Sequence, residues 1–445
     1  MRVHASSDGA RTFAHMLDFE SPGAKVWNGT GNNGTAAGYS SLVTLPQRGQ
    51  LGLAWETSGP GASCIGSRCR VVFSTFDTRW LDDHRGGKPR QQQPTCPTKP
   101  LAGSAVAPVE VFAFDPPLNK SDWMQMDWDR ITTLALFVPW PPPADLYCHA
   151  HSRGIKIVHC IDFHATGIAN PSMRSAWVAQ HVAEALQFGT DGVNVDIEGF
   201  RGQKADLNAL IEELYTRFKK AIPAAQITFD TDIFPRDEPG YDYRTLAKSL
   251  DFFVPMFYDM ALPPQHLANS PYDGLAKSVA QYRGYGIGQE RLVFALPWHG
   301  YSFPCASASL GTECEPDCAV PRKTCPEVQY AQAVQTLRNR SFAARKDLWS
   351  LDTASESVYF EYLDDNHTRH QLWFDDEVSL AAKYRRCRAL GARGVGMWTA
   401  GSLEYGTTPA GQKRTAKMWR ALREFTANNG TLSPSRMSDS ATDDA

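Results

Sequence analysis

Short apolar runs alternate with amphipathic helical patterns along the chain from about residue 105 onward. In order, the runs are VEVFAFD, ITTLALFV, IKIVHCIDF, GVNVDIE, ITFDTDIF, FFVPMFYD, RLVFALPW and GVGMWTA. Near-continuous apolar strands separated by helices indicate a parallel sheet covered on both faces. Eight such units over about 300 residues predict an α/β fold, a (β/α)8 TIM barrel, rather than an open doubly wound sheet. The chain also has no G-x-G-x-x-G motif after an early strand, which further disfavours a dinucleotide-binding fold.

Two of the intervening helices carry clear end signals. Segment 170–189 is predicted to begin with Asn170 as the N-cap and Pro171 at the first helical position. Segment 206–222 is predicted to be capped by Asp206, with acidic residues early and lysines late, as the helix dipole favours. Along the first helix the apolar positions recur near a helical period, at Met173, Trp177, Val182 and Leu186.

Composition shifts divide the chain into regions. Residues 1–105 are rich in Gly, Ser, Thr and Pro and are predicted to be an N-terminal extension of unknown role, partly disordered, that ends in a linker at 91–103. The barrel domain is expected over 106–426. An insertion between its seventh and eighth strands, at about 302–372, contains the strand pair SVYFEYL and HQLWFDD. The polar, acidic segment 427–445 is predicted to be a disordered tail.

Charge and hydropathy exclude two classes of partner. The 445 residues carry a formal net charge of −3, so no attraction to nucleic acid or to an anionic membrane surface is expected. No stretch of about 18 apolar residues is present, so no transmembrane helix is predicted. The first thirty residues lack the apolar core of a signal peptide.

Other features point to the secretory route. Four of the ten cysteines crowd into one loop-like stretch, which is typical of a disulfide-stapled loop in an oxidising compartment: Cys305, Cys314, Cys318 and Cys325. A four-cysteine zinc site is the alternative, but one pair alone has zinc-type spacing. Acceptor sequons for N-glycosylation occur at Asn28, Asn33, Asn119, Asn339, Asn366 and Asn429. We therefore expect a lysosomal or secreted protein, despite the missing signal peptide.

The candidate chemistry lies in GTDGVNVDIEGF, residues 189–200. Alternation along this strand places Asn194, Asp196 and Glu198 on the inner face of the barrel and the intervening apolar residues toward the helices. Burying polar groups without partners costs about 1–3 kcal/mol each, so this row of three indicates a ligand site or a satisfied polar network. Asp196 disfavours ionisation of Glu198, which suits Glu198 to general-acid catalysis. A metal site is less favoured, because no histidine lies within the motif.

The strand motif resembles the D-x-x-D-x-D-x-E signature of glycoside hydrolase family 18, the chitinase-like enzymes. Asp191, Asn194, Asp196 and Glu198 occupy the four positions, and the Asn is typical of the chitobiases of that family. Ordered flanking blocks such as PVEVFAFD, LPWHGYSF and LWFDDEVSLAAKYRRCRALGARGVGMW extend the resemblance over about 105–425. The chain departs from the family pattern near strand ends, at Gly199, Phe200, Met260, His299 and Ser302.

The resemblance implies a retaining, substrate-assisted mechanism with an oxazolinium intermediate. Glu198 would be the acid and base, Asp196 would orient the substrate acetamide, and Tyr258 would hydrogen-bond its oxygen. Asn194 and Asp191 would support this catalytic set. Five further residues would line the sugar site: Trp398, Met256, Asp259, Asp162 and Asp230. No metal and no cofactor are implied, and the histidines His149, His151, His159 and His164 are interpreted as helix-surface and strand-end residues.

The sequence therefore predicts a glycosidase acting on β-1,4-linked N-acetylglucosamine in chitobiose-type units, including Asn-linked glycan cores and chito-oligosaccharides. A chitinase or an endo-β-N-acetylglucosaminidase on the same scaffold is the first alternative. A catalytically inactive, chitin-binding lectin is the second, and the intact Glu198 argues against it. The expected partner is an oligosaccharide containing N-acetylglucosamine, and the protein is expected to be a monomer.

Overall fold

The chain divides into two compact units, Met1–Gln91 and Gln92–Ala445. The computed structural model describes residues 96–101, 109–163, 167–236, 240–260, 268–306, 314–316, 325–340, 350–406 and 408–426, together with the strand backbone of the first unit. In that unit β1 (Arg2–Ala5) pairs with β2 (His15–Asp18). A second antiparallel sheet contains β3 (Ala37–Thr44), β4 (Gln50–Thr57) and β5 (Arg70–Asp77). The predicted tail 427–445 lies outside the described residues.

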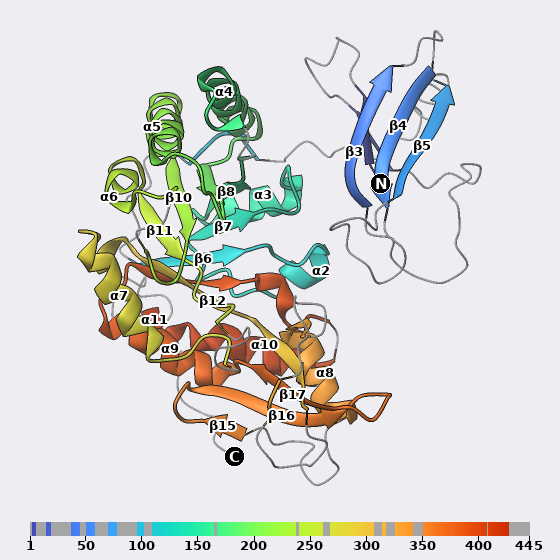
Figure 1. Ribbon diagram of the computed structural model, residues 1–445, viewed down its shortest axis with the longest axis vertical. Coiled ribbons are helices and arrows are strands. Elements are labelled where there is room, and N and C mark those ends of the chain that lie inside the picture. Colours follow the sequence, from blue (N-terminus) through green and yellow to red (C-terminus); the bar gives the residue numbers. More distant parts are fainter. Residues whose placement is uncertain are drawn as a thin grey trace. The chain divides into compact units, whose positions relative to one another are not determined.

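A barrel of eight parallel strands forms the centre of the second unit (Figure 1). The strands are β6 (Glu110–Phe114), β7 (Thr133–Leu136), β8 (Lys156–Ile161), β9 (Gly192–Val195), β10 (Gln226–Thr231), β11 (Phe252–Pro255), β12 (Val293–Pro297) and β18 (Gly394–Trp398). Parallel bridges from Phe253 to Leu292 and from Met256 to Ala295 join β11 to β12 and close the barrel. Each strand coincides with one of the predicted apolar runs, so the barrel prediction is confirmed.

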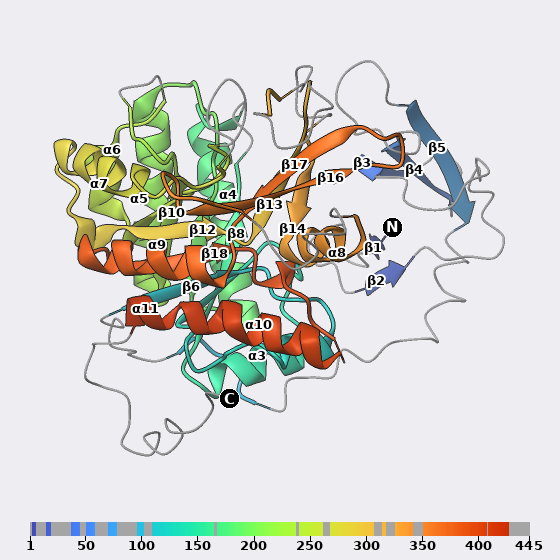
Figure 2. The same ribbon diagram turned by 90° about the horizontal axis from the view of Figure 1, so that it is seen from below.

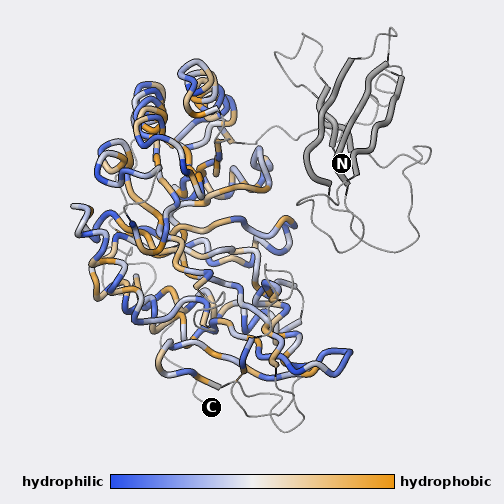
Figure 3. The backbone as a smooth tube through the Cα atoms, viewed as in Figure 1, coloured by the Kyte–Doolittle hydropathy of each residue, from blue (hydrophilic) through white to orange (hydrophobic). Residues whose placement is uncertain are grey.

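Helices surround the strands, and hydrophobic residues follow the strands while the outer helices show hydrophilic stretches (Figures 2 and 3). An inner cluster that includes Phe112, Val158, Phe252 and Val293 fills the barrel, and a larger cluster lies between the strands and the helices. Within the described residues no helix is long and apolar enough to cross a membrane. The α-helices are α2 (Lys120–Trp123), α3 (Ala144–His151), α4 (Pro171–Phe188), α5 (Lys204–Ala221), α6 (Tyr243–Leu246), α7 (Gly274–Gly284), α8 (Tyr330–Arg340), α9 (Glu377–Ala389), α10 (Pro409–Ala421) and α11 (Arg423–Thr426).

Helix α4 has the predicted ends but a different buried face. The Asn170 side chain accepts hydrogen bonds from the first-turn backbone, and Gly189 closes the helix in a left-handed conformation. The buried residues are Arg174, Val178, His181 and Ala185, whereas Met173 and Leu186 are each 51% exposed. The predicted start of α5 is off by three residues: the N-cap is Gln203 rather than Asp206. Asp206 lies in the first turn of the helix, 3.4 Å from Arg174.

The insertion is an antiparallel sheet with one helix. Its strand order is β14 (Glu327–Gln329), β13 (His299–Pro304), β17 (Arg369–Phe374), β16 (Ser357–Leu363) and β15 (Ser350–Asp352), and α8 packs against it. The predicted pairing of β16 with β17 is confirmed. The insertion begins slightly earlier than predicted, because β13 follows β12 after a single residue. A buried ion pair between Lys383 of α9 and Asp375, with N–O distance 2.5 Å, joins the insertion to the barrel.

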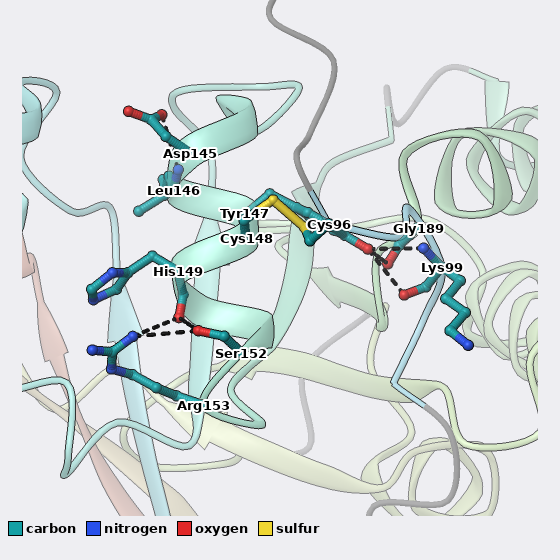
Figure 4. Close-up of a disulfide and its surroundings, with 10 residues drawn as sticks. All are labelled: Cys96, Lys99, Asp145, Leu146, Tyr147, Cys148, His149, Ser152, Arg153 and Gly189. Carbon is teal, nitrogen blue, oxygen red and sulfur yellow. Dashed lines mark hydrogen bonds between the residues drawn. A yellow bond between two sulfur atoms is a disulfide. The ribbon is translucent and has the colours of Figure 1, made fainter.

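The cysteine-rich loop contains disulfide bonds, as predicted, and not the four-cysteine zinc site that was the alternative. Cys305 is bonded to Cys314, and Cys325 is also disulfide-bonded, so these sulfurs are not available to a metal. A further bond joins Cys96 to Cys148 of α3 (Figure 4). Beside it, the Tyr147 hydroxyl accepts from the Lys99 amide and donates to the Lys99 carbonyl. Residues 96–101, within the predicted linker, are thus anchored to the barrel.

Candidate active site

The side chains of the strand that carries the motif point as predicted, with apolar residues outward and Asn194 inward. Val193, Val195 and Ile197 lie in the hydrophobic layer between strands and helices, while Asn194 is fully buried inside the barrel. The regular strand ends at Val195, and the chain continues past Asp196 toward Glu198, which is exposed. The polar face of the motif therefore runs from the interior of the barrel to its carboxyl-terminal mouth, where TIM-barrel enzymes place their active sites.

Asn194 joins β9 to β10 through both ends of its amide. Its Oδ1 accepts from the Thr228 hydroxyl at 2.6 Å, and its Nδ2 donates to Asp230 Oδ2 at 2.6 Å. An amide can make this pair of bonds because it offers a donor and an acceptor at once, whereas an ionised carboxylate offers acceptors alone. Asn194 thereby fixes Asp230, which stands beside it on the next strand.

Asp196 and Asp230 are carboxyl groups on the inner side of the barrel, and the negative charges of neighbouring acids act on both of them. Burial, followed by the charges of Glu198 and Asp162, raises the pKa of Asp196 to about 7. Burial and the charge of Asp196 raise the pKa of Asp230 well above its usual range. In each group Oδ1 is buried without a hydrogen-bond partner in the described part of the protein. The strand pattern predicts that the pKa of Glu198 is raised by Asp196. The structure shows a raised pKa at these two more deeply buried groups, and the expectation for Glu198 stays a prediction.

The backbone around Glu198 is held by Tyr241, a residue that the sequence argument missed. The Tyr241 hydroxyl donates to the Ile197 carbonyl at 2.7 Å and accepts from the Phe200 amide at 2.9 Å. The segment on either side of Glu198 is therefore fixed from across a loop. Glu198 opens into a pocket whose other lining residues include Ile197, Gly199, Asp230, Thr231, Asp232, Tyr241, Tyr243 and Met256. The structure thus brings Glu198, Asp230 and Met256 to one cavity.

Aromatic rings form the opposite side of the barrel mouth. Trp398 ends β18, and Tyr258 follows β11 with its ring centroid 6.2 Å from the indole. The edges of Phe114 and Phe137 contact the Trp398 ring at centroid distances of 5.3 and 5.6 Å. Burial, then the charges of Asp230, Asp196, Asp259 and Glu198, raises the pKa of Tyr258 well above its usual range. Tyr258 therefore keeps its proton among these carboxylates and can donate it in a hydrogen bond.

Asp259 is positioned by side chains that sequence reasoning did not select. Tyr301, from the first strand of the insertion, donates its hydroxyl proton to Asp259 Oδ1 at 2.5 Å. Asn269 accepts from the Asp259 amide at 2.6 Å, and His299 Nε2 lies 3.4 Å from Asp259 Oδ1. Asp259 has a φ of 63°, a conformation that needs such support. Ser302, the neighbouring departure from the family pattern, instead bonds within the insertion.

The remaining predicted residues lie at different ends of the strands. Asp162 is exposed after β8, close enough for its charge to act on Asp196. Asp191 lies at the amino-terminal end of β9, away from Glu198. Its carboxylate accepts from the backbone amides of Ile157 and Leu101, each at 2.7 Å, and lies 2.9 Å from His151 Nε2. The structure therefore gathers the predicted set at the barrel mouth except for Asp191, which ties the opposite end of the strand to the segment after Cys96.

An exposed carboxyl group beside half-buried and buried acids, facing a tryptophan, suits a carbohydrate substrate, because sugars offer an apolar face to stack and a glycosidic oxygen to protonate. The model of the glycosyl hydrolases family 18 matches residues 162–402. The chain belongs to glycoside hydrolase family 18 and is a glycoside hydrolase of the chitin-degrading type.

Curated relatives match most of the second unit. The chain is 32% identical over 335 residues to di-N-acetylchitobiase of Rattus norvegicus, covering 71% of this chain and 88% of the rat protein. It is 30% identical over 331 residues to di-N-acetylchitobiase of Homo sapiens, covering 71% and 83% of the two chains. The fold is shared with a family 18 chitinase from Cycas revoluta in complex with (GlcNAc)3, at TM-score 0.58 and 16% identity, covering 72% of this chain and 100% of the other.

Proposed function

We propose that the protein hydrolyses the β-1,4 linkage between N-acetylglucosamine residues in chitobiose-type units, such as those of Asn-linked glycan cores and chito-oligosaccharides. The observation that carries the proposal is the Oδ1 of Asp196 next to Glu198 at the barrel mouth, which is buried and has no hydrogen-bond partner among the described residues. A buried carboxylate oxygen without a partner is costly unless a ligand supplies a donor, and the acetamido N–H of the substrate is such a donor. Relatives named di-N-acetylchitobiase support this choice of sugar.

In the first step Glu198 donates its proton to the glycosidic oxygen. The 2-acetamido carbonyl oxygen of the substrate attacks the anomeric carbon as the bond to the leaving sugar breaks, which yields an oxazolinium ion. Asp196 accepts the acetamido N–H and stabilises the positive charge that develops there. The Tyr258 hydroxyl donates to the acetamido oxygen and aligns it for attack, and the sugar stacks on the half-buried indole of Trp398.

In the second step the Glu198 carboxylate removes a proton from water, which attacks the same carbon from the side of the departed sugar. The carbon–oxygen bond of the oxazolinium ring breaks, the acetamide is restored, and the product keeps its original anomeric configuration. Because Asp196 has a pKa of about 7, it is largely protonated in the free enzyme at acidic pH. We propose that substrate binding favours its ionised form, because the acetamido N–H then faces an ionised acceptor, and that the released proton passes to solvent.

The other predicted residues have supporting roles in this proposal. Met256 lines the pocket beside Glu198, and Asp259 and Asp162 contribute polar groups at the rim. Asp191 acts at a distance by fixing the start of β9 through its backbone contacts. The chemistry needs no cofactor, since every proton transfer is assigned to a side chain or to the substrate.

We also propose a lysosomal or secreted location and a monomeric enzyme. The disulfides Cys96–Cys148 and Cys305–Cys314 suit an oxidising compartment. The sequon residues Asn119 and Asn366 are exposed, as glycosylation requires.

Product analysis with N,N′-diacetylchitobiose and chitotriose tests the proposed function. We expect release of N-acetylglucosamine from both substrates and a loss of about 10²–10⁴-fold in kcat for Glu198→Gln. Glu212→Gln, an exposed charge removal on α5, is the matched control and should keep full activity. An enzyme that cleaves longer oligomers internally while leaving chitobiose intact would be a chitinase or endo-glycosidase. Binding of these sugars without any hydrolysis would identify a lectin.

A further inference from the structure

A cluster of two histidines and a glutamate lies on the outer face of the barrel, apart from the active site. His159 is on β8, and His181 and Glu184 are three residues apart on α4. Glu184 Oε2 lies 3.1 Å from His181 Nδ1 and 3.6 Å from His159 Nδ1, and one donor atom from each residue lies within 4.8 Å of the others. Since Cys160, the next residue on β8, faces Asn194 inside the barrel, His159 points outward.

The protein alone satisfies this cluster incompletely. His181 and Glu184 are within hydrogen-bond distance, whereas His159 Nδ1 is buried without a hydrogen-bond partner among the residues that the structure describes. Aromatic rings hold both imidazoles in place. Trp140 stacks on His159 with centroids 3.6 Å apart and planes at 5°, and Trp177 meets His181 edge-on at 4.6 Å. The nitrogen of His159 is thus fixed toward the carboxylate at a distance too long for a direct bond.

This donor set fits one class of ligand. Two imidazole nitrogens and one carboxylate oxygen form the ligand set of zinc sites that keep a fourth position for water. Tetrahedral ligands at the usual zinc distances lie about 3.3 Å from one another. The two nitrogen–oxygen distances, 3.1 and 3.6 Å, fall on either side of that value. The Glu184 side chain is 24% exposed, which leaves a path for solvent and for ion entry.

We propose that His159, His181 and Glu184 bind one Zn²⁺ ion, which joins α4 to β8. The ion satisfies the buried Nδ1 of His159 and replaces a single hydrogen bond by three metal bonds across the helix–strand interface. The site is independent of the proposed glycosidase chemistry, because its side chains lie outside the barrel while Asp196 and Glu198 belong to the inner face of the neighbouring strand.

Isothermal titration of the untagged, chelator-treated full chain with ZnCl₂ tests the proposal. We expect one equivalent to bind, with the affinity lowered at least ~10-fold in Glu184→Gln and in His181→Gln. His149→Gln is the matched control: His149 is also packed against tryptophans, at 4.7 Å from Trp128, and its Nε2 is also buried and unpaired. This control should bind Zn²⁺ as the wild type does. Activity on chitobiose, measured without zinc, should be unchanged in all three variants and reports correct folding.

Cobalt provides a readout that does not depend on the variants. Wild-type protein with one equivalent of Co²⁺ should develop the intense visible absorption of a tetrahedral complex, and Zn²⁺ should abolish it. Failure of the wild type to bind Zn²⁺, or absence of the tetrahedral cobalt spectrum, overturns the proposal. Equal zinc affinity in the wild type, Glu184→Gln and His181→Gln overturns it as well, since the ion would then bind elsewhere.

Discussion

Replacement of Asp196 by Asn should stabilise the free enzyme at neutral pH while reducing its activity. Burial, Glu198 and Asp162 together raise the pKa of Asp196 from 3.8 to about 7. The folded state therefore resists ionisation of this group, and the unfolded chain does not. Above pH 7 the native protein must hold a partly buried charge whose Oδ1 has no partner among the described residues. Asparagine has nearly the same shape and carries no charge to bury.

The sign and size of the effect follow from proton linkage. Because the folded pKa of Asp196 is raised, its contribution to stability is fully present below about pH 4 and is lost as the pH rises through about 7. The difference between 3.8 and about 7, at 1.36 kcal/mol per pH unit, corresponds to about 4 kcal/mol. Asp196→Asn should therefore match the wild type near pH 4 and exceed its free energy of unfolding by up to about 4 kcal/mol above pH 7. The variant retains Asp230, so its own stability still falls with pH, but less steeply.

Urea unfolding at half-unit steps from pH 4 to pH 8 measures the effect, with the catalytic rate on chitobiose recorded in parallel. The matched control is Glu212→Gln, which removes an exposed charge on α5 and should leave the pH dependence of stability unchanged. If Asp196→Asn and the wild type differed by the same amount at every pH, the assignment of a raised pKa to Asp196 would be refuted.

Two further substitutions test the surroundings of the site. Asn194→Asp places a second carboxyl group 2.6 Å from Asp230, and the added negative charge should raise the pKa of Asp196 further. The acidic limb of the pH–rate profile should therefore move to higher pH. Identical acidic limbs in the variant and the wild type would contradict this prediction. Lys383→Met leaves the fully buried Asp375 without its cation and should lower the free energy of unfolding by about 3–5 kcal/mol in urea titrations. Lys417→Met removes a more exposed ion pair, with Glu377, and should lower the free energy of unfolding by less than about 1 kcal/mol. Equal losses of stability in the two variants would show that burial of the Lys383–Asp375 pair does not increase its contribution.

The barrel could be predicted from the sequence because its signals are local. Each strand is a compact apolar run, because both faces of the sheet are covered. Alternation of polar and apolar residues is therefore visible only where the inward-facing residues are polar, as at Asn194. The ends of α4 were also predictable, since Asn170 and Gly189 act on their own helix. The buried face of α4 was not predictable. Arg174 donates to the Ile168 carbonyl and the His181 ring contacts His159 of β8, and an apolar pattern does not encode such contacts.

The row of polar residues proposed as catalytic was predictable, and the side chains that position it were not. Asp196 and Glu198 follow directly after β9, and their spacing of two residues already predicts that they lie on the same side of the chain. Tyr241 contacts the backbone around Glu198 from 44 residues away, and Tyr301 reaches Asp259 across 42 residues. Such contacts depend on where the loops and the insertion pack against the barrel, and the periodicity of apolar residues in the sequence does not show this. No residue type in these loops is unusual enough to mark them.

The amide of Asn194 limits the number of ionisable groups inside the barrel. If all three inner groups were carboxyls, the added negative charge would raise the pKa values of its neighbours still further. With Asn194 donating to Asp230 Oδ2 at 2.6 Å, the amide supplies that hydrogen bond without supplying an ionisable proton. Asp230 Oδ1 then remains as a buried acceptor without a partner among the described residues. Asn194 thus holds Asp230 in place while leaving Asp196 and Asp230 as the two inner carboxyl groups of the row, both with raised pKa values.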